Sequence, residues 1–167
     1  MELFEAISNR RSVRKYKKDF IPKDMLEKIV DAGRWAATAR NDCPWHFTVI
    51  TDKERLKQLE LLTEKPTKNA MFLKDAAAAV VVTSKNTKYY LEDGSAATQN
   101  ILLAAHALGV GTCWIAGDKK DYCPDILAFV SAPPGEKLVS IVSCGIPDEK
   151  PVKKKPDLDK VISWDRF

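Results

Sequence analysis

A cluster of cationic side chains and one hydroxyl follows a short amphipathic run near the start of the sequence. The run is Glu2–Ser8, and the cluster comprises Arg10, Arg11, Ser12 and Arg14. Guanidinium groups donate paired hydrogen bonds to phosphate oxygens, and a serine hydroxyl adds a donor without charge. If the run before it is a helix, the cluster lies where the chain leaves that helix. We therefore interpret the cluster as a candidate phosphate-binding segment, with a solvated basic surface as the alternative.

Composition limits the class of protein. The chain has 167 residues, 45% of them hydrophobic, which is enough for one well-buried domain and short for two. Its 27 Lys and Arg against 23 Asp and Glu leave a formal charge of +4, a smaller excess than dedicated nucleic-acid-binding proteins carry. We therefore expect a single domain over residues 1–167 and no nucleic-acid partner. A basic nucleic-acid module remains the weakest alternative, and its affinity would depend strongly on salt.

The cysteines and histidines argue against a metal centre. The chain has two histidines, and its four cysteines show no C-x-x-C spacing: Cys43, Cys113, Cys123 and Cys144. Zinc and iron–sulfur sites need tighter clusters of ligands. We therefore expect no metal, cysteines that fill core space, and thiols that stay reduced in the cytoplasm.

Membrane insertion and secretion are not expected either. The longest apolar runs, at 76–82 and 101–105, are too short to span a bilayer. The first residues form an acidic amphipathic segment, whereas a signal peptide begins with basic residues followed by an apolar stretch. We therefore predict no membrane partner.

Hydrophobic periodicity predicts helices and strands in alternation, and these elements must position the basic cluster. Apolar residues at helical spacing predict four helices, at 22–37, 53–62, 91–108 and 121–130. Short runs rich in β-branched residues predict four strands, at 47–51, 77–83, 112–115 and 138–144. This alternation indicates an α+β or α/β sandwich with four or five strands. The helix at 91–108 is so rich in Ala and Leu that we expect it in the core or at a subunit interface.

The C-terminal segment has the character of an extended arm. From residue 148 onward it is rich in proline and lysine, and it carries the aromatic residues Trp164 and Phe167. Aromatic side chains in a free terminus would expose apolar surface to water. We therefore expect residues 148–167 to pack on a second subunit.

Three further segments accompany the basic cluster in a fixed order. They are Trp35–Phe47, Gln99–Gly117, and Gly145–Pro147 followed by Lys153–Pro156. Together with the cluster, these segments resemble the FMN-dependent nitroreductase family from Leu3 to Pro156. The resemblance implies an α+β fold with a central mixed, mainly antiparallel sheet flanked by helices. It also implies a homodimer with FMN at the subunit interface.

The resemblance assigns roles to the basic residues. It implies that the FMN phosphate and neighbouring polar edges are held by Arg10, Arg11, Ser12 and Lys155, with Lys153 as a second candidate for the last position. Arg14 matches a basic residue near the flavin N1 and C2 carbonyl. A cation there is physically reasonable, because two-electron reduction places negative charge on that edge.

Two uncharged segments complete the implied site. Thr38–Trp45 matches a motif that the family contributes from the opposite subunit, in which Thr38 keeps a serine hydroxyl and Asn41 is unchanged. Cys43 replaces a glutamine and loses an amide that would orient flavin or ribityl groups. The Ile115-Ala116-Gly117 turn matches a loop whose backbone N–H points at flavin N5. Gly117 could equally end a strand and have no other role.

The implied activity is hydride transfer from NADH or NADPH through FMN N5 to a small-molecule acceptor such as a nitroaromatic or a quinone. We assign no catalytic side chain, because the flavin supplies the redox chemistry, and we expect His46 and His106 to be packed or surface residues. Two alternatives remain open. One is a flavin carrier or redox sensor with little turnover. The other is a different reaction of reduced FMN: dehalogenation, dehydrogenation or flavin fragmentation.

Overall fold

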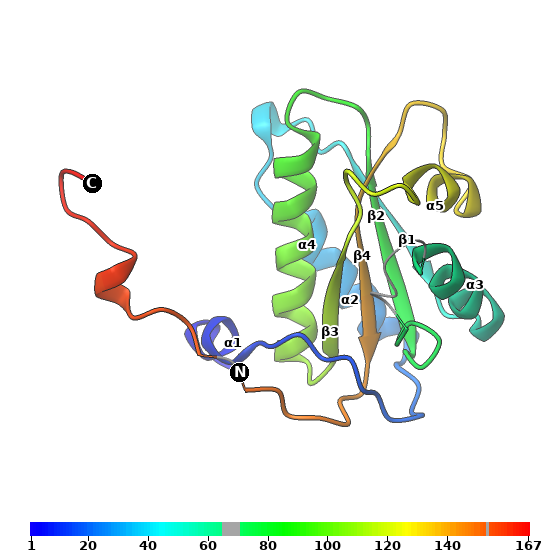
Figure 1. The fold of residues 1–167 in the computed structure, drawn as a ribbon, viewed down its shortest axis with the longest axis horizontal. Coiled ribbons are helices and arrows are strands. Elements are labelled where there is room, and N and C mark those ends of the chain that lie inside the picture. The colour runs from blue at the N-terminus through cyan, green and yellow to red at the C-terminus, as the bar shows by residue number, and fades with distance from the viewer. Residues whose placement is uncertain (65–70, 153) are drawn as a thin grey trace.

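The computed structural model describes residues 1–64, 71–152 and 154–167. Its helices and strands follow the predicted alternation (Figure 1). The helices are α1 (Leu3–Asn9), α2 (Lys23–Arg34), α3 (Lys53–Thr63), α4 (Tyr90–Ala107) and α5 (Cys123–Phe129), with short 3-10 turns η1 (Ala39–Asn41) and η2 (Leu158–Lys160). The strands are β1 (Trp45–Ile50), β2 (Ala78–Ser84), β3 (Gly111–Ala116) and β4 (Lys137–Gly145).

The four strands form one antiparallel sheet in the order β1-β2-β4-β3. The predicted α+β class is therefore confirmed. The sheet is less mixed than expected, because its strands all pair antiparallel. A parallel contact occurs as an isolated bridge between Ser12 and Thr112. Strands β1 and β3 are the two edges, so β3 keeps one side free of strand pairing.

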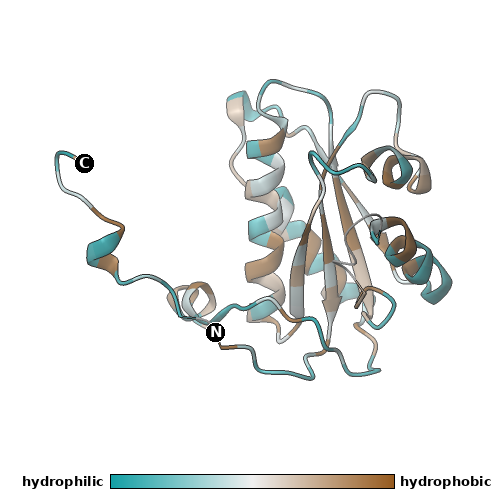
Figure 2. Cartoon of the chain, viewed as in Figure 1, coloured by the Kyte–Doolittle hydropathy of each residue, from teal (hydrophilic) through white to brown (hydrophobic). Residues whose placement is uncertain are grey.

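Helices cover both faces of the sheet, as Figure 1 shows. On one face Val80 and Val82 of β2 belong to a core that includes residues of α2 and α4. On the other face Val81 belongs to a core that includes residues of α3 and α5. Because both faces of β2 are buried, its sequence is continuously apolar instead of alternating. In Figure 2 the strands are largely brown to white, whereas the helices carry both brown and teal residues.

Helix α4 packs closely on the sheet because small residues line its inner face. A Cβ added to Gly94 would lie 2.6 Å from the Val139 side chain of β4. One turn later, the Thr98 and Ser140 hydroxyls hydrogen-bond at 2.8 Å. The inner face of α4 therefore belongs to the core. The sequence also allowed this helix to lie at a subunit interface. Such an interface would involve the outer face of α4, and it stays a prediction.

The two ends of the chain meet at one end of the sheet. The Lys17 amide donates to the Ile146 carbonyl at 2.9 Å, and the Asp148 amide donates to the Lys15 carbonyl at 2.9 Å. Beyond this junction the arm leads away from the sheet and helices (Figure 1), and Trp164 is 82% exposed. Within the described ranges, no helix combines the length and apolar character needed to cross a bilayer.

Candidate functional site

A pocket of about 350 Å³ lies along the free side of β3. This volume falls within the range of about 300–1,000 Å³ that is usual for cofactor sites. The lining residues come from the basic segment, from β3 and from the loop that follows β3: Arg14, Phe72, Cys113, Trp114, Ile115, Ala116, Lys120 and Tyr122. The structure therefore brings three of the sequence-predicted residues together, namely Arg14, Ile115 and Ala116.

Backbone hydrogen bonds fix Arg14 at the mouth of this pocket. The Val13 amide donates to the Thr112 carbonyl of β3 at 2.9 Å. The next two amides, those of Arg14 and Lys15, both donate to one carboxylate oxygen of Glu149. Arg14 therefore leaves the sheet edge in a defined direction, and its guanidinium lies 5.9 Å from the centre of the Phe72 ring.

Two glycines allow the basic segment to lie against the end of the sheet. A Cβ added to Gly111 would lie 2.9 Å from Val13, and one added to Gly145 would lie 2.5 Å from the Tyr16 ring. Side chains at these positions would force the segment away. The buried Tyr16 hydroxyl then donates to the Val13 carbonyl at 2.6 Å, and this bond spans the segment that contains Arg14.

Arg10, Arg11 and Ser12 are half-buried where α1 ends. The Nη1 atom of Arg11 donates to the Ser8 carbonyl at 2.6 Å and to the Arg10 carbonyl at 2.9 Å. This guanidinium therefore also caps carbonyls at the end of α1. Within the described part of the chain, no carboxylate forms a salt bridge with any of the three arginines of the cluster. Their charge is therefore available to an anionic ligand.

His106 lies near Arg10 and Arg11 at this end of the fold. Burial lowers the pKa of its imidazole, and the charges of Arg10 and Arg11 lower it further. Its Nε2 atom is buried and has no hydrogen-bond partner among the described residues. An anion bound to Arg10 and Arg11 would reduce this unfavourable concentration of positive charge.

The end of β3 directs the backbone amide of Ala116 to the pocket side. In an antiparallel pair, successive residues direct their N–H and C=O groups alternately toward and away from the partner strand. Thr112 directs its carbonyl away from β4, toward Val13, so Ala116 also faces away from β4. The Gly117 amide instead donates to the Val139 carbonyl of β4 at 3.2 Å. Of the predicted turn Ile115-Ala116-Gly117, Ala116 therefore presents its amide on the pocket side.

Gly117 has a structural explanation. A Cβ at this position would lie 2.7 Å from the backbone carbonyl of Val139. Close packing on β4 is therefore sufficient to require glycine here, whereas the exposed, small Ala116 leaves space on the pocket side.

Burial keeps the other titratable groups of the pocket protonated. It raises the pKa of the Cys113 thiol, although the Arg14 charge opposes the shift, and it raises the pKa of Tyr122 to about 12. Both groups are thus neutral near pH 7. Arg14 and Lys120 supply positive charge, and none of the described residues that line the pocket is Asp or Glu, so it suits a ligand that carries or develops negative charge.

Thr38, Asn41 and Cys43 lie together at the opposite end of α4. The Ala39 amide donates to Asp93 at the start of α4 at 2.9 Å, whereas Arg10 and Arg11 lie near His106 at its end. Thirteen residues separate Asp93 from His106, or about 20 Å at the helical rise of 1.5 Å per residue. Within one chain, this segment and the basic cluster therefore do not form a common site.

The Thr38–Cys43 segment also has an unusual backbone. Arg40, Asn41 and Cys43 have φ values of 56°, 57° and 44°, in the left-handed region that side chains other than Gly and Asn rarely adopt. Cys43 is exposed, so the expectation that the cysteines fill core space is wrong for this residue. It holds for Cys113 and Cys144, which are buried.

The two predicted lysines lie in the arm. Lys155 is exposed, six residues after Glu149, and Lys153 lies outside the described residues. Six extended residues span about 20 Å at most, so Lys155 remains within chain reach of the basic cluster. The structure does not bring Lys155 into the pocket of Arg14.

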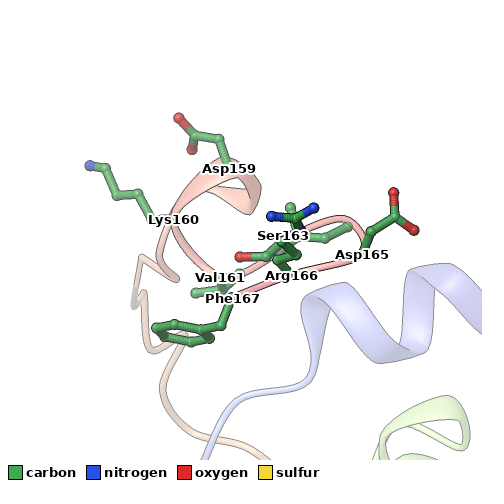
Figure 3. Close-up of a pocket in the computed structure, with 8 residues that line it drawn as sticks. Asp159, Lys160, Val161, Ser163, Asp165, Arg166 and Phe167 are labelled. Carbon is green, nitrogen blue, oxygen red and sulfur yellow. The ribbon is translucent and has the colours of Figure 1, made fainter.

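Sequence reasoning missed five residues of the pocket: Phe72, Cys113, Trp114, Lys120 and Tyr122. All of them except Phe72 lie close in sequence to the predicted turn, and that proximity was the one available signal. A larger hollow of about 600 Å³ (Figure 3) is formed by the arm alone, from residues 159–167, and it contains no residue of the sheet or its helices.

Among the described residues, no three His, Cys, Asp or Glu side chains are grouped as a metal site would require.

Comparisons with known proteins identify the family of this chain. The model of the nitroreductase family matches residues 7–146. The chain is 36% identical to a candidate NADH dehydrogenase/NAD(P)H nitroreductase of Methanothermobacter thermautotrophicus, over 98% of this chain and 88% of the relative. The solved FMN-dependent nitroreductase of Clostridium difficile superposes with a TM-score of 0.87 at 31% identity, covering 98% of this chain and 99% of the other.

A more distant relative is named as a different enzyme. The iodotyrosine deiodinase of Thermotoga neapolitana is 24% identical over 99% of this chain and 98% of its own length. The family match covers most of the described fold, including β1 to β4 and the segment that carries Arg14. The chain belongs to the nitroreductase family.

Proposed function

We propose that the protein is an FMN-dependent oxidoreductase that passes a hydride from NADH or NADPH to a small acceptor such as a nitroaromatic or a quinone. The pocket on the free side of β3 carries this proposal. A cation, Arg14, and a free backbone amide, that of Ala116, border the same pocket in a chain related to FMN-dependent nitroreductases. These are the two kinds of group that a flavin ring requires at its pyrimidine edge and at N5.

The chemistry of these residues suits FMN. When bound, FMN supplies the hydride-accepting centre. Arg14 stabilises negative charge that develops at the pyrimidine edge, and the Ala116 amide donates a hydrogen bond near N5. The phosphate is held at the electropositive end of the fold by Arg10, Arg11 and Ser12, and we assign Lys155 of the arm to the same anion.

A homodimer is part of the proposal. Residues 1–167 form a single FMN-binding domain in which residues 148–167 pack on the partner. Two observations support this assembly: α1 exposes large apolar side chains, with Phe4 82% exposed, and the arm exposes Trp164 equally. A second copy would also bring Thr38, Asn41 and Cys43 to a flavin that they cannot reach within one chain. The free cysteines of the structure accord with a cytoplasmic location.

Absorbance spectroscopy of the purified protein tests the function directly. We expect a flavin spectrum with one FMN per chain, which bleaches rapidly when NADH or NADPH is added without oxygen. Addition of a nitroaromatic or quinone should restore the oxidised spectrum with turnover. A protein that binds no FMN would contradict the proposal, and a bound FMN that neither pyridine nucleotide reduces would indicate a carrier or sensor.

The deiodinase relative favours reductive dehalogenation as a second candidate. The pocket has no acidic lining residue and could admit a halogenated phenol that bears a negative charge. Iodide release from iodotyrosine, measured with dithionite as the reductant, tests this reaction separately from pyridine nucleotide oxidation. Iodide release without nitroaromatic turnover would favour the second candidate.

A further inference from the structure

Two neighbouring side chains hold two consecutive carbonyls of the turn after β3. The Tyr122 hydroxyl donates to the Ala116 carbonyl. The Cys123 thiol donates to the Gly117 carbonyl at 2.7 Å. Both donors come from the start of α5, which folds back over the end of β3. The turn is therefore tied to a helix as well as to β4.

The Tyr122 contact determines the orientation of one peptide unit. The Ala116–Gly117 peptide has its N–H bonded to the Val139 carbonyl and its C=O bonded to Tyr122. Both ends of that peptide are engaged, which restricts the ψ rotation of Ala116. The Ala116 amide itself lies in the preceding peptide, which the pairing of Ile115 with Ile141 of β4 restricts. Tyr122 and β4 together therefore hold Ala116 with its amide directed toward the pocket.

The position of Tyr122 suits such a role. Its side chain is 6% exposed and lines the same pocket as Arg14. The hydroxyl lies at the end of a rigid aromatic ring. The helix that begins here, α5, is anchored by Ile126, which is fully buried. A hydroxyl fixed in this way holds its acceptor more firmly than a surface side chain would.

We propose that Tyr122 is a positioning residue for flavin chemistry: by holding the Ala116 carbonyl, its hydroxyl keeps the Ala116 amide directed at the redox edge of FMN. This role rests on the proposed function, since a bound FMN is what gives the amide a partner. Tyr122 does not itself exchange protons or electrons with the substrate.

Tyr122→Phe removes the hydroxyl and keeps the ring. Tyr90→Phe is the matched control, because the Tyr90 hydroxyl also bonds to this loop, but to the Asp118 side chain at 2.6 Å and not to the backbone. Hydrogen exchange of the FMN-free proteins, followed by mass spectrometry, reports on the turn without any flavin. We expect the Gly117 amide to exchange about tenfold faster in Y122F and at the wild-type rate in Y90F.

The FMN-loaded proteins then test the link to the cofactor. We expect Y122F to bind FMN within about twofold of the wild-type affinity, to alter the midpoint potential of FMN, and to slow its reduction by about tenfold. Unchanged exchange of Gly117 would overturn the proposal. So would faster exchange combined with an unchanged potential and rate.

A second variant covers the case in which Y122F does not fold. Ala116→Pro removes the amide hydrogen itself and leaves Tyr122 intact, and Ala116 donates no hydrogen bond to β4 that proline would break. We expect A116P to reproduce the altered potential and slower reduction. A fully loaded A116P with the wild-type potential would overturn the proposed role of Tyr122. Wild-type protein that binds no FMN would instead overturn the proposed function, while the exchange experiment would still report on the turn.

Discussion

At the scale of single residues, the site consists of charges and donors held by the backbone. Two contacts position Arg14. The neighbouring Val13 amide is hydrogen-bonded to β3, and the Glu149 carboxylate accepts a hydrogen bond from the Arg14 amide. Arg14, Ile115 and Ala116 border one pocket, as the family resemblance implied, although they are distant in sequence. Phe72 was not predicted, because its place depends on the packing of a distant segment, and Tyr122 was not predicted, because no local pattern shows that the chain folds back after β3.

Arg10 and Arg14 should differ in their effects, since they serve opposite ends of the cofactor. Arg10→Ala should weaken FMN binding roughly ten- to a hundredfold, because hydrogen bonds to charged groups contribute about 1.5–3 kcal/mol. Arg14→Ala should slow reduction of FMN by NADH or NADPH by a similar factor and weaken binding less. Fluorescence titration with FMN and stopped-flow reduction measure the two quantities. The reverse pattern would contradict the assigned roles.

His106 should make the fold sensitive to acid. Burial, Arg10 and Arg11 hold its pKa below the ordinary value, so the unfolded chain binds a proton more readily than the folded one. Stability that depends on neutral His106 is present above the unfolded pKa of about 6.5 and is lost as the pH falls through the lower folded pKa. Urea denaturation of FMN-free protein should therefore show a smaller loss of stability between pH 7 and pH 5 in His106→Gln than in the wild type.

The other histidine provides the control for this experiment. His46 lies on β1, far along the sheet order from β3, and His46→Gln should retain the pH dependence of the wild type. If His106→Gln loses stability with acid as steeply as the wild type, the Arg10 and Arg11 charges do not act on this histidine.

At the scale of elements, local patterns predicted the helices and strands but not their arrangement. The strand observed at Trp45–Ile50 and the helix observed at Tyr90–Ala107 lie within about two residues of the predicted bounds, because hydrophobic period is a local property. The helix predicted at 121–130 begins at Cys123, because Pro124 occupies its first turn. The order β1-β2-β4-β3 could not be predicted, since it depends on pairing between distant strands.

Gly145 tests whether the approach of the basic segment to the sheet positions the site. In Gly145→Ala the new Cβ would lie 2.5 Å from the Tyr16 ring, so the segment that carries Arg14 must shift. We expect a loss of about 1–3 kcal/mol in the free energy of unfolding, measured with urea, together with weaker FMN binding. Both effects have one cause, the displaced segment.

Gly33→Ala is the matched control for this substitution. Its Cβ would lie 2.8 Å from Ile101, in the core between α2 and α4, where no residue of the basic segment lies. We expect Gly33→Ala to lower stability and to leave the FMN dissociation constant near the wild-type value. Equal losses of FMN affinity in both variants would show that general destabilisation, and not the position of Arg14, governs binding.

At the scale of the whole molecule, one chain holds the two groups of residues that we assign to the FMN site far apart. The pocket of Arg14 lies along β3, whereas Thr38, Asn41 and Cys43 lie at the start of α4, about 20 Å along that helix from the basic cluster. The family resemblance implied both parts and assigned the second to the opposite subunit, whereas spacing along the chain alone does not report distance in the fold. An exposed apolar α1 and an exposed aromatic arm supply the surface on which a second copy would pack.

Dimer dissociation and FMN loss should therefore occur together. On serial dilution, light scattering and flavin fluorescence should give the same midpoint, because each flavin depends on residues from both chains. Replacing Trp164 and Phe167 with serine should move both midpoints to higher protein concentration, since large apolar side chains contribute about 1.5–3 kcal/mol each when buried. Arg166→Ser, in the same arm, should move neither midpoint. A stable monomer that retains FMN would show that one chain completes the site and that Thr38, Asn41 and Cys43 take no part in it.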